Sequence, residues 1–182
     1  MALMHSTMVP LGEPAPGFSL PGVDGKEYTL DSFTGKRILV VIFMCNHCPY
    51  VKAVLSRLID LQNRMGDRGV QLVGINSNDA SRYPDDSFES MKKIAEEKKF
   101  SFPYLFDETQ EIARAYDAVC TPDIYVYGEE RTLLYRGRID DNWEQPEKVT
   151  KKDLEGALEA ALAGREIAEE QIPSMGCSIK WK

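Results

Sequence analysis

The chain has 182 residues, of which 43% are hydrophobic, which is enough for one domain with a buried core. Lys and Arg number 22 against 29 Asp and Glu, so the net charge is −7 and no basic cluster stands out. This balance excludes nucleic acid and anionic membranes as expected partners. Four cysteines are too few for a fold built on disulfides.

Hydropathy and cysteine usage indicate where the protein works. No stretch approaches the roughly 20 apolar residues of a membrane span. Residues 1–10 contain no Lys or Arg and no long apolar core, so they do not resemble a secretory signal. We therefore expect a cytoplasmic protein, in which thiols are kept reduced and disulfides are transient and catalytic.

The chain opens with a proline-rich segment, residues 1–16, which we expect to be an extended and partly mobile lead. Two short strands are predicted next, at Phe18–Leu20 and Tyr28–Leu30. The turn residues of Val23–Lys26 lie between them. The pattern predicts an N-terminal β-hairpin.

Two cysteines three positions apart follow, between a predicted strand and a predicted helix. Ile38–Met44 is a continuous apolar run rich in Val and Ile, which is typical of a buried strand. Val51–Met65 has apolar residues at helical spacing. Cys45 and Cys48 therefore lie where a helix begins. Unpaired N–H groups and the helix dipole favour a thiolate there, and the thiolate is the reactive form of cysteine.

Pro49 indicates how this helix starts, because proline fits a helix only in its first turn. Either Asn46 caps the helix with Pro49 at the third position, or Cys48 is the cap and Pro49 the first helical residue. In both cases Cys45 precedes the helix, and we expect it to be the more accessible sulfur. A protonated His47 between the cysteines would stabilise a nearby thiolate.

A zinc site is the alternative reading of the cysteine pair. Zinc sites use about four ligands, commonly from a second Cys or His pair. Beyond the motif and its histidine the chain offers only His5, Cys120 and Cys177, without a second paired spacing. We therefore expect redox chemistry, no bound metal and no cofactor.

The remaining pattern alternates strands and helices. Polar residues 76–86 form a long loop after a buried strand, and they either border a ligand crevice or serve as a solvated connection. A capping box of Thr150 and Asp153 opens the last helix, and Gly164 ends it. The predicted elements are strands at 71–75, 103–106, 124–127 and 133–136, helices at 88–98, 110–116 and 151–163, and a tail at 165–182.

Strands joined by helices predict an α/β fold with parallel pairing and helices on both faces of the sheet. The last two strands form a hairpin that adds an antiparallel edge. No internal repeat or boundary divides the chain, so we expect residues 1–182 to form one domain.

A C-x-x-C at the start of a helix, followed much later by Thr121-Pro122 before a strand, resembles the thioredoxin superfamily. The resemblance implies a thioredoxin-like fold, a central mixed sheet flanked by helices, here with an N-terminal hairpin extension. It also implies that Pro122 is a cis proline packed beside Cys45 and Cys48. Thr121 would then have a backbone free to pair with an extended substrate, and Asn46 would contact that substrate.

Longer motifs resemble the alkyl hydroperoxide reductase/thiol-specific antioxidant branch, and within it a peroxiredoxin-like subgroup. The similarity covers nearly the whole chain. Its motifs are Gly17-Phe-Ser-Leu-Pro21, Cys45–Ala53, Ile75-Asn-Ser-Asn-Asp79, Pro103–Gln110, Cys120-Thr-Pro-Asp123, Arg136–Trp143 and Gly176–Trp181.

Two departures from these families involve three positions. Typical peroxiredoxins have Thr or Ser three residues before the reactive cysteine, where this chain has Ile42, and a proline where it has Ile38. Typical thioredoxins have a buried Asp six residues before the first cysteine, where this chain has Leu39. The first departure argues against peroxide activation by that hydroxyl, and the second leaves proton transfer to other groups.

The predicted activity is thiol–disulfide exchange, in which Cys45 attacks a disulfide and Cys48 resolves the mixed disulfide. The expected partners are a protein or small-molecule disulfide and a thiol electron donor, and the expected state is a monomer or weak homodimer. Cys120 and Cys177 are possible accessory thiols. The alternative for Cys120 is a small residue buried in the core, and the alternative for Cys177 is a packed or idle thiol in the tail. One alternative function is a peroxidase that forms sulfenic acid at Cys45. The other is a copper(I) chaperone that uses both motif cysteines and His47.

Overall fold

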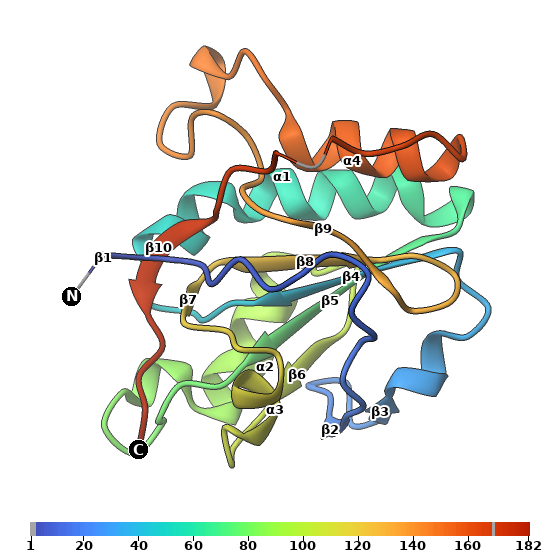
Figure 1. Cartoon of the computed structure of the whole chain (residues 1–182). Coiled ribbons are helices and arrows are strands. Elements are labelled where there is room, and N and C mark those ends of the chain that lie inside the picture. The colour runs from blue at the N-terminus through green and yellow to red at the C-terminus, as the bar shows by residue number, and fades with distance from the viewer. Residues whose placement is uncertain (1–2, 169) are drawn as a thin grey trace.

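A five-stranded sheet with β4 (Ile38–Phe43) at its centre organises the computed structural model, which describes residues 3–168 and 170–182 (Figure 1). All six residues of β4 are buried, as the continuous apolar run predicts. The strand order is β6-β5-β4-β8-β9. The other strands of this sheet are β5 (Val70–Asn76), β6 (Tyr104–Phe106), β8 (Asp123–Tyr127) and β9 (Leu133–Arg136).

The register of β4 brings two distant segments of the chain together. β4 pairs parallel with β5 on one side and antiparallel with β8 on the other, so the predicted mixed sheet is confirmed. Its last residue, Phe43, lies opposite Asp123. Because Cys45 follows β4 and Pro122 precedes β8, the cysteine motif and the Thr-Pro segment must meet at this end of the sheet.

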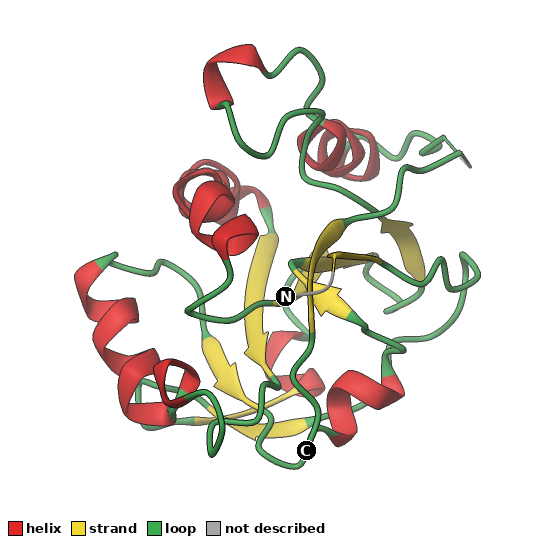
Figure 2. Cartoon of the chain, turned by 90° about the vertical axis from the view of Figure 1, so that its left-hand side faces the viewer, coloured by secondary structure: helices red, strands yellow, loops and turns green. Residues whose placement is uncertain are grey.

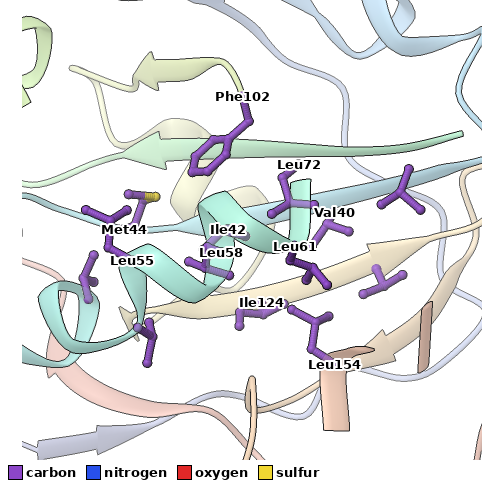
Figure 3. Packing of buried hydrophobic residues seen from close by; sticks show 14 of the residues in the cluster. Val40, Ile42, Met44, Leu55, Leu58, Leu61, Leu72, Phe102, Ile124 and Leu154 are labelled. Carbon is purple, nitrogen blue, oxygen red and sulfur yellow. The ribbon is translucent and has the colours of Figure 1, made fainter. Parts of the chain in front are cut away.

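Helices cover both faces of the sheet (Figure 2). Helix α1 (Pro49–Met65) packs Leu55, Leu58 and Leu61 against β4 and β8 (Figure 3). The same core receives α2 (Phe88–Glu97) and α4 (Asp153–Leu162). The opposite core contains α3 (Glu111–Ala115) and residues around the hairpin of β2 (Ser19–Pro21) and β3 (Glu27–Thr29). Four short 3₁₀ helices are η1 (Leu30–Phe33), η2 (Gly66–Arg68), η3 (Pro84–Asp86) and η4 (Pro146–Lys148).

The predicted N-terminal hairpin is confirmed, with Ser19 opposite Thr29 in an antiparallel pair. Among the described residues, no helix has both the length and the apolar character needed to cross a bilayer.

The tail forms a strand that the sequence does not predict. A second sheet has the order β1-β10-β7, in which β10 (Met175–Ser178) pairs antiparallel with both β1 (Leu3–His5) and β7 (Cys120–Thr121) (Figure 1). These strands are too short to show an alternating pattern. The lead is extended at β1, as expected, and the tail, for which no strand was predicted, pairs with β1 and with β7.

The predicted start of the last helix is also wrong. Helix α4 has Lys152 at its N-cap without a side-chain cap. The backbone and hydroxyl of Thr150 both donate to Asp141, and Asp153 accepts from Arg138. Each half of the expected capping box thus has another partner. The predicted end holds, since Gly164 follows the helix with a positive φ of 67°.

Candidate active site

The two motif cysteines lie at the junction of β4 and α1. Cys48 has extended backbone angles at the N-cap, and Pro49 is the first residue of the helix. Of the two starts compatible with the sequence, the structure has the one with Cys48 as cap. Proline has no N–H to leave unpaired in this first turn, so the helix can begin immediately after the second cysteine.

Both sulfurs are covered by protein. Cys45 is 1% exposed and Cys48 is 0% exposed, and neither is in a disulfide. The expected difference in accessibility is therefore wrong. The cysteines belong to the apolar core that α1 buries, so the motif faces inward instead of outward.

The pKa values of Cys45 and Cys48 shift in opposite directions, chiefly because the two side chains interact with each other. The pKa of Cys48 is lowered by hydrogen bonding with Cys45, by Thr121, and by backbone N–H groups of Val51 and Cys177. The pKa of Cys45 is raised because its thiol donates to Cys48, because it is buried, and because the Asp86 carboxylate is close. In the reduced pair one proton therefore stays on Cys45 while Cys48 carries the negative charge.

Thr121 and Pro122 lie beside this pair, as the resemblance implies. The Thr121–Pro122 peptide bond is cis. Thr121 Oγ1 lies 3.6 Å from Cys45 Sγ, and the Thr121 carbonyl oxygen lies 3.1 Å from Cys48 Sγ. When Cys48 is protonated, its thiol donates to that carbonyl oxygen. The predicted contact of this segment with both sulfurs is thus present.

The expected free edge at Thr121 is absent, because β10 covers it. Cys177 lies opposite Thr121, and Ser178 lies opposite Cys120. Gly176 makes this approach feasible, since a Cβ on it would lie 1.9 Å from the Thr121 carbonyl oxygen. The edge that an extended substrate was expected to use is already paired with the protein's own tail.

Asp86, at the end of η3, holds the cysteine motif in place. It is 0% exposed. Its Oδ1 accepts from the Asn46 N–H at 2.7 Å, and its Oδ2 lies 2.6 Å from His47 Nδ1 and 2.7 Å from Asn78 Nδ2. Sequence reasoning did not single out Asp86. Loop 76–86 was expected either to border a ligand crevice or to be a solvated connection. The structure places it beside the cysteine motif, through Asp86.

His47 contacts this carboxylate more closely than it contacts sulfur. Its Nδ1 is 4.0 Å from Cys45 Sγ, against 2.6 Å from Asp86. The ring stacks on Tyr83, with centroids 5.4 Å apart and planes at 7°. His47 is thus part of the site, and its ring nitrogen pairs with the Asp86 carboxylate more closely than with the Cys45 sulfur.

Asn46 has a different role from the substrate contact that we expected. Its side-chain oxygen accepts from Tyr104 OH at 3.0 Å, and its Nδ2 donates to the Asp85 carbonyl at 2.8 Å. Both ends of the amide are engaged within the protein. Asn46 therefore fixes the loop between the cysteines.

Cys120 lies on the far side of the Thr-Pro segment. It is 0% exposed, and its Sγ is 3.7 Å from the Pro122 carbonyl oxygen. Asp123 also lies there with 0% exposure, and burial raises its pKa to about 7. Sequence reasoning missed Asp123, although a carboxylate at the start of an apolar strand was a signal for it. Cys120 is thus buried in the core, which was the alternative to an accessory redox role.

Cys177 reaches the cysteine pair from β10. It is 3% exposed and belongs to the same apolar core as Cys45 and Cys48. Burial, and then interaction with the nearby Cys48 side chain, raise the pKa of Cys177 to about 11. The structure therefore brings three of the four thiols into one cluster.

The same region contains a set of groups that could bind a metal. Ligand atoms of Cys45, His47 and Asp86 all lie within 4.8 Å of one another. Asp86 already accepts hydrogen bonds from the backbone N–H of Asn46 and the side-chain amide of Asn78, and it also lies against His47 Nδ1. A metal ion would have to replace these contacts, so the donor set fits a hydrogen-bonded motif better than a metal centre.

A cavity of about 420 Å³ lies next to Pro122. Tyr50 and Trp143 line it with ring centroids 4.2 Å apart, and Arg138 adds a positive charge. The wall that carries Trp143 is held by Arg57 of α1, which forms an ion pair with Asp140 and donates to the carbonyls of Asn142 and Trp143. Asp140, Asp141 and Glu144 also line the cavity, and Arg138 is paired with Asp153. The lining therefore fits a small molecule with an apolar part and sets no preference for an anion.

Solved structures share this architecture over the whole chain. An uncharacterized conserved protein from Geobacillus kaustophilus is 49% identical, with a TM-score of 0.94 over 100% of this chain and 97% of that one. A hypothetical protein from Sinorhizobium meliloti 1021 is 37% identical, with a TM-score of 0.94 over 98% of each chain. A thiol:disulfide interchange protein of the thioredoxin family from Chlorobium tepidum TLS shares the fold at 22% identity, with a TM-score of 0.65 over 83% of this chain and 97% of that one.

Curated relatives and a family match identify the family of this chain. Peroxiredoxin Bcp from Escherichia coli K12 is 29% identical over 105 residues, which span 58% of this chain and 62% of the relative. The thiol-disulfide oxidoreductase ResA of Bacillus thuringiensis subsp. konkukian is 20% identical over 142 residues, 78% of each chain. The AhpC/TSA family matches residues 11–136. The chain has a thioredoxin-like fold and belongs to the AhpC/TSA family.

Proposed function

We propose that the protein is a thiol–disulfide oxidoreductase that interconverts the dithiol and disulfide states of Cys45 and Cys48. The observation that carries this proposal is the placement of both sulfurs against the same residue, Thr121, at the N-cap of α1 and beside Pro122. Two cysteines three positions apart that both lie against Thr121 can form a disulfide with little motion of the backbone. The opposite shifts of their pKa values supply one thiolate and one proton donor.

The reaction starts from the pair that shares one proton. Cys45 attacks one sulfur of a substrate disulfide while its proton passes along the hydrogen bond to Cys48. A Cys45–substrate disulfide forms, and the other substrate sulfur leaves as a thiolate. Cys48 then loses its proton and attacks Cys45, which releases the second substrate thiol and leaves the Cys45–Cys48 disulfide. A donor thiol reverses these steps and restores the dithiol.

Replacement of each cysteine tests this order. Cys45→Ser should abolish turnover with a small disulfide, since no group is left to form the mixed disulfide. Cys48→Ser should accumulate the mixed disulfide at Cys45, visible as an added substrate mass. Full activity of both variants would rule out the mechanism.

The covered sulfurs favour a small-molecule disulfide as the substrate. An extended protein substrate would have to displace β10 from Thr121, whereas the cavity beside Pro122 already has the size of a small molecule. Reduction rates for a small disulfide and for a protein disulfide, measured at equal concentration, test this preference. A faster reaction with the protein disulfide would contradict it.

The proposal includes a thiol electron donor, a monomer or weak homodimer, and a cytoplasmic location. The low cysteine content supports the location. Light scattering across a concentration series measures the state of association. Cell fractionation measures the location.

A thiol peroxidase is the second candidate, because Thr121 supplies a hydroxyl that the sequence lacks at Ile42. Its Oγ1 lies 3.6 Å from Cys45 Sγ. The AhpC/TSA match and the peroxiredoxin relatives also support this function. In both functions Cys45 must first pass its proton to Cys48, because its pKa is raised and the thiolate attacks peroxide as well as disulfide. Stopped-flow peroxide consumption by the reduced protein separates the two functions.

A further inference from the structure

The third thiol of the cluster, Cys177, has no part in the mechanism above. It lies in β10 at the position opposite Thr121, on the edge that an extended substrate would use. The Thr121 carbonyl oxygen lies 3.1 Å from Cys48 Sγ, so β10 places Cys177 next to Cys48 in the same buried cluster. The two side chains also shift each other's pKa. Cys177 therefore approaches Cys48 as a sulfur of a bound substrate would.

The position of Cys177 is fixed from both sides. Before it, Ser6 and Ser174 exchange hydrogen bonds at 2.9 and 3.0 Å. After it, the Lys180 N–H donates to Asn78 Oδ1 at 2.8 Å, and Gln110 Nε2 donates to the Lys180 carbonyl at 2.7 Å. These contacts keep the thiol against Cys48.

We propose that Cys177 is a third redox-active thiol, which takes over the disulfide from Cys45 by attack on Cys48. In this step the Cys177 thiolate attacks Cys48, the Cys45–Cys48 bond breaks, and a Cys48–Cys177 bond forms. The proton lost by Cys177 ends on the departing Cys45 thiolate. The number of disulfides is unchanged, so the exchange needs no external oxidant. This proposal rests on the proposed function, because it starts from the Cys45–Cys48 disulfide.

Cys48 is the hub of this exchange, since its sulfur lies against Thr121, which pairs with Cys177, and since both other thiols shift their pKa through interaction with it. In the reduced protein the nearby Cys48 thiolate adds to the burial that keeps Cys177 protonated. That negative charge disappears when Cys48 enters a disulfide, which makes Cys177 easier to ionise. Formation of the Cys45–Cys48 disulfide thus prepares Cys177 for its attack. The attack then returns Cys45 to the thiol state.

Disulfide mapping tests the proposal because trypsin separates the thiols suitably. Cys45 and Cys48 fall in peptide 38–52, Cys120 in peptide 115–131, and Cys177 in peptide 166–180. The full chain is oxidised with glutathione disulfide, quenched with acid and alkylating agent, and digested without reductant. We expect the wild type to give both the internally oxidised peptide 38–52 and its covalent product with peptide 166–180.

Variants decide which bond is made. Cys45→Ser should convert almost entirely to the linked 38–52/166–180 product, and adding Cys177→Ser should remove it and leave glutathione on Cys48. Cys177→Ala serves as a second variant if the serine disturbs folding, and Cys120→Ser should leave the linked product unchanged. A Cys45→Ser protein that carries only glutathione, without linked peptide, overturns the role of Cys177. If the wild type forms no Cys45–Cys48 disulfide either, the proposed function fails as well.

Discussion

Replacement of Gly176 by alanine tests whether the close approach of β10 to Thr121 stabilises the protein. The added Cβ would lie 1.9 Å from the Thr121 carbonyl oxygen and 2.7 Å from its carbon, where real contacts are not below 3.0 Å. Both clashing atoms are backbone, so rotation of a side chain cannot relieve the overlap. β10 would have to move away by more than about 1 Å, and its pairing with β7 would break.

The structure gives the size of this effect. Two paired positions of the ladder would be lost, at about 1 kcal/mol for each hydrogen bond. Ile179, which is 3% exposed, would lose burial worth roughly 1.5–3 kcal/mol. We therefore expect Gly176→Ala to lower the free energy of unfolding by about 3–5 kcal/mol. For a chain of this length that corresponds to a fall in Tm of roughly 10 °C.

Thermal unfolding and amide hydrogen exchange across β10 measure this change. Gly156→Ala is the matched control, since Gly156 lies inside α4 with no atom within 4 Å of an added Cβ. That control should be stabilised by about 0.5–1 kcal/mol, as expected for Gly→Ala in a helix. If Gly176→Ala melts with the wild type and protects β10 equally, the steric argument is refuted.

Three further predictions concern the core and the charges of the site. Burial raises the Asp123 pKa to about 7 from 3.8, so the folded state retains a proton that the unfolded state releases. Stability should therefore fall by a few kcal/mol between about pH 4 and pH 7, and urea unfolding of Asp123→Asn should show a flatter pH dependence. Leu58→Ala should cost about 2–5 kcal/mol by creating a cavity under α1, whereas Asn63→Ala on its exposed face should change the urea midpoint little. Asp86→Asn removes a charge that raises the Cys45 pKa, so alkylation of Cys45 should shift to lower pH when compared within a Cys48→Ser background; an unchanged midpoint would contradict this.

The sequence predicts the main sheet and the meeting of its two motifs. The apolar run of β4, the helical spacing of α1 and the strands around Pro122 each carry a strong local pattern. The resemblance of the C-x-x-C and Thr-Pro segments to thioredoxins adds their contact. These features together were sufficient to place both cysteines at the N-terminus of a helix beside a cis proline.

The features that control access to the site depend on long-range contacts, so local patterns did not reveal them. β10 has four residues, including Gly176, and it becomes a strand only because β7 and β1 lie on either side of it. Asp86 resembles its polar neighbours in loop 76–86 until folding places it under the backbone of Asn46. The burial of both sulfurs follows from these two additions.

The attachment of Arg57 connects ligand recognition to the redox pair. Its guanidinium belongs to α1, the helix that Cys48 caps, and it holds residues 140–143 through Asp140 and two carbonyls. The aromatic wall of the cavity and the attacking sulfurs therefore share one rigid support. Exchange of the 141–146 segment between homologues, with Arg57 and Asp140 kept, should alter which disulfide is selected while the chemistry at sulfur stays the same.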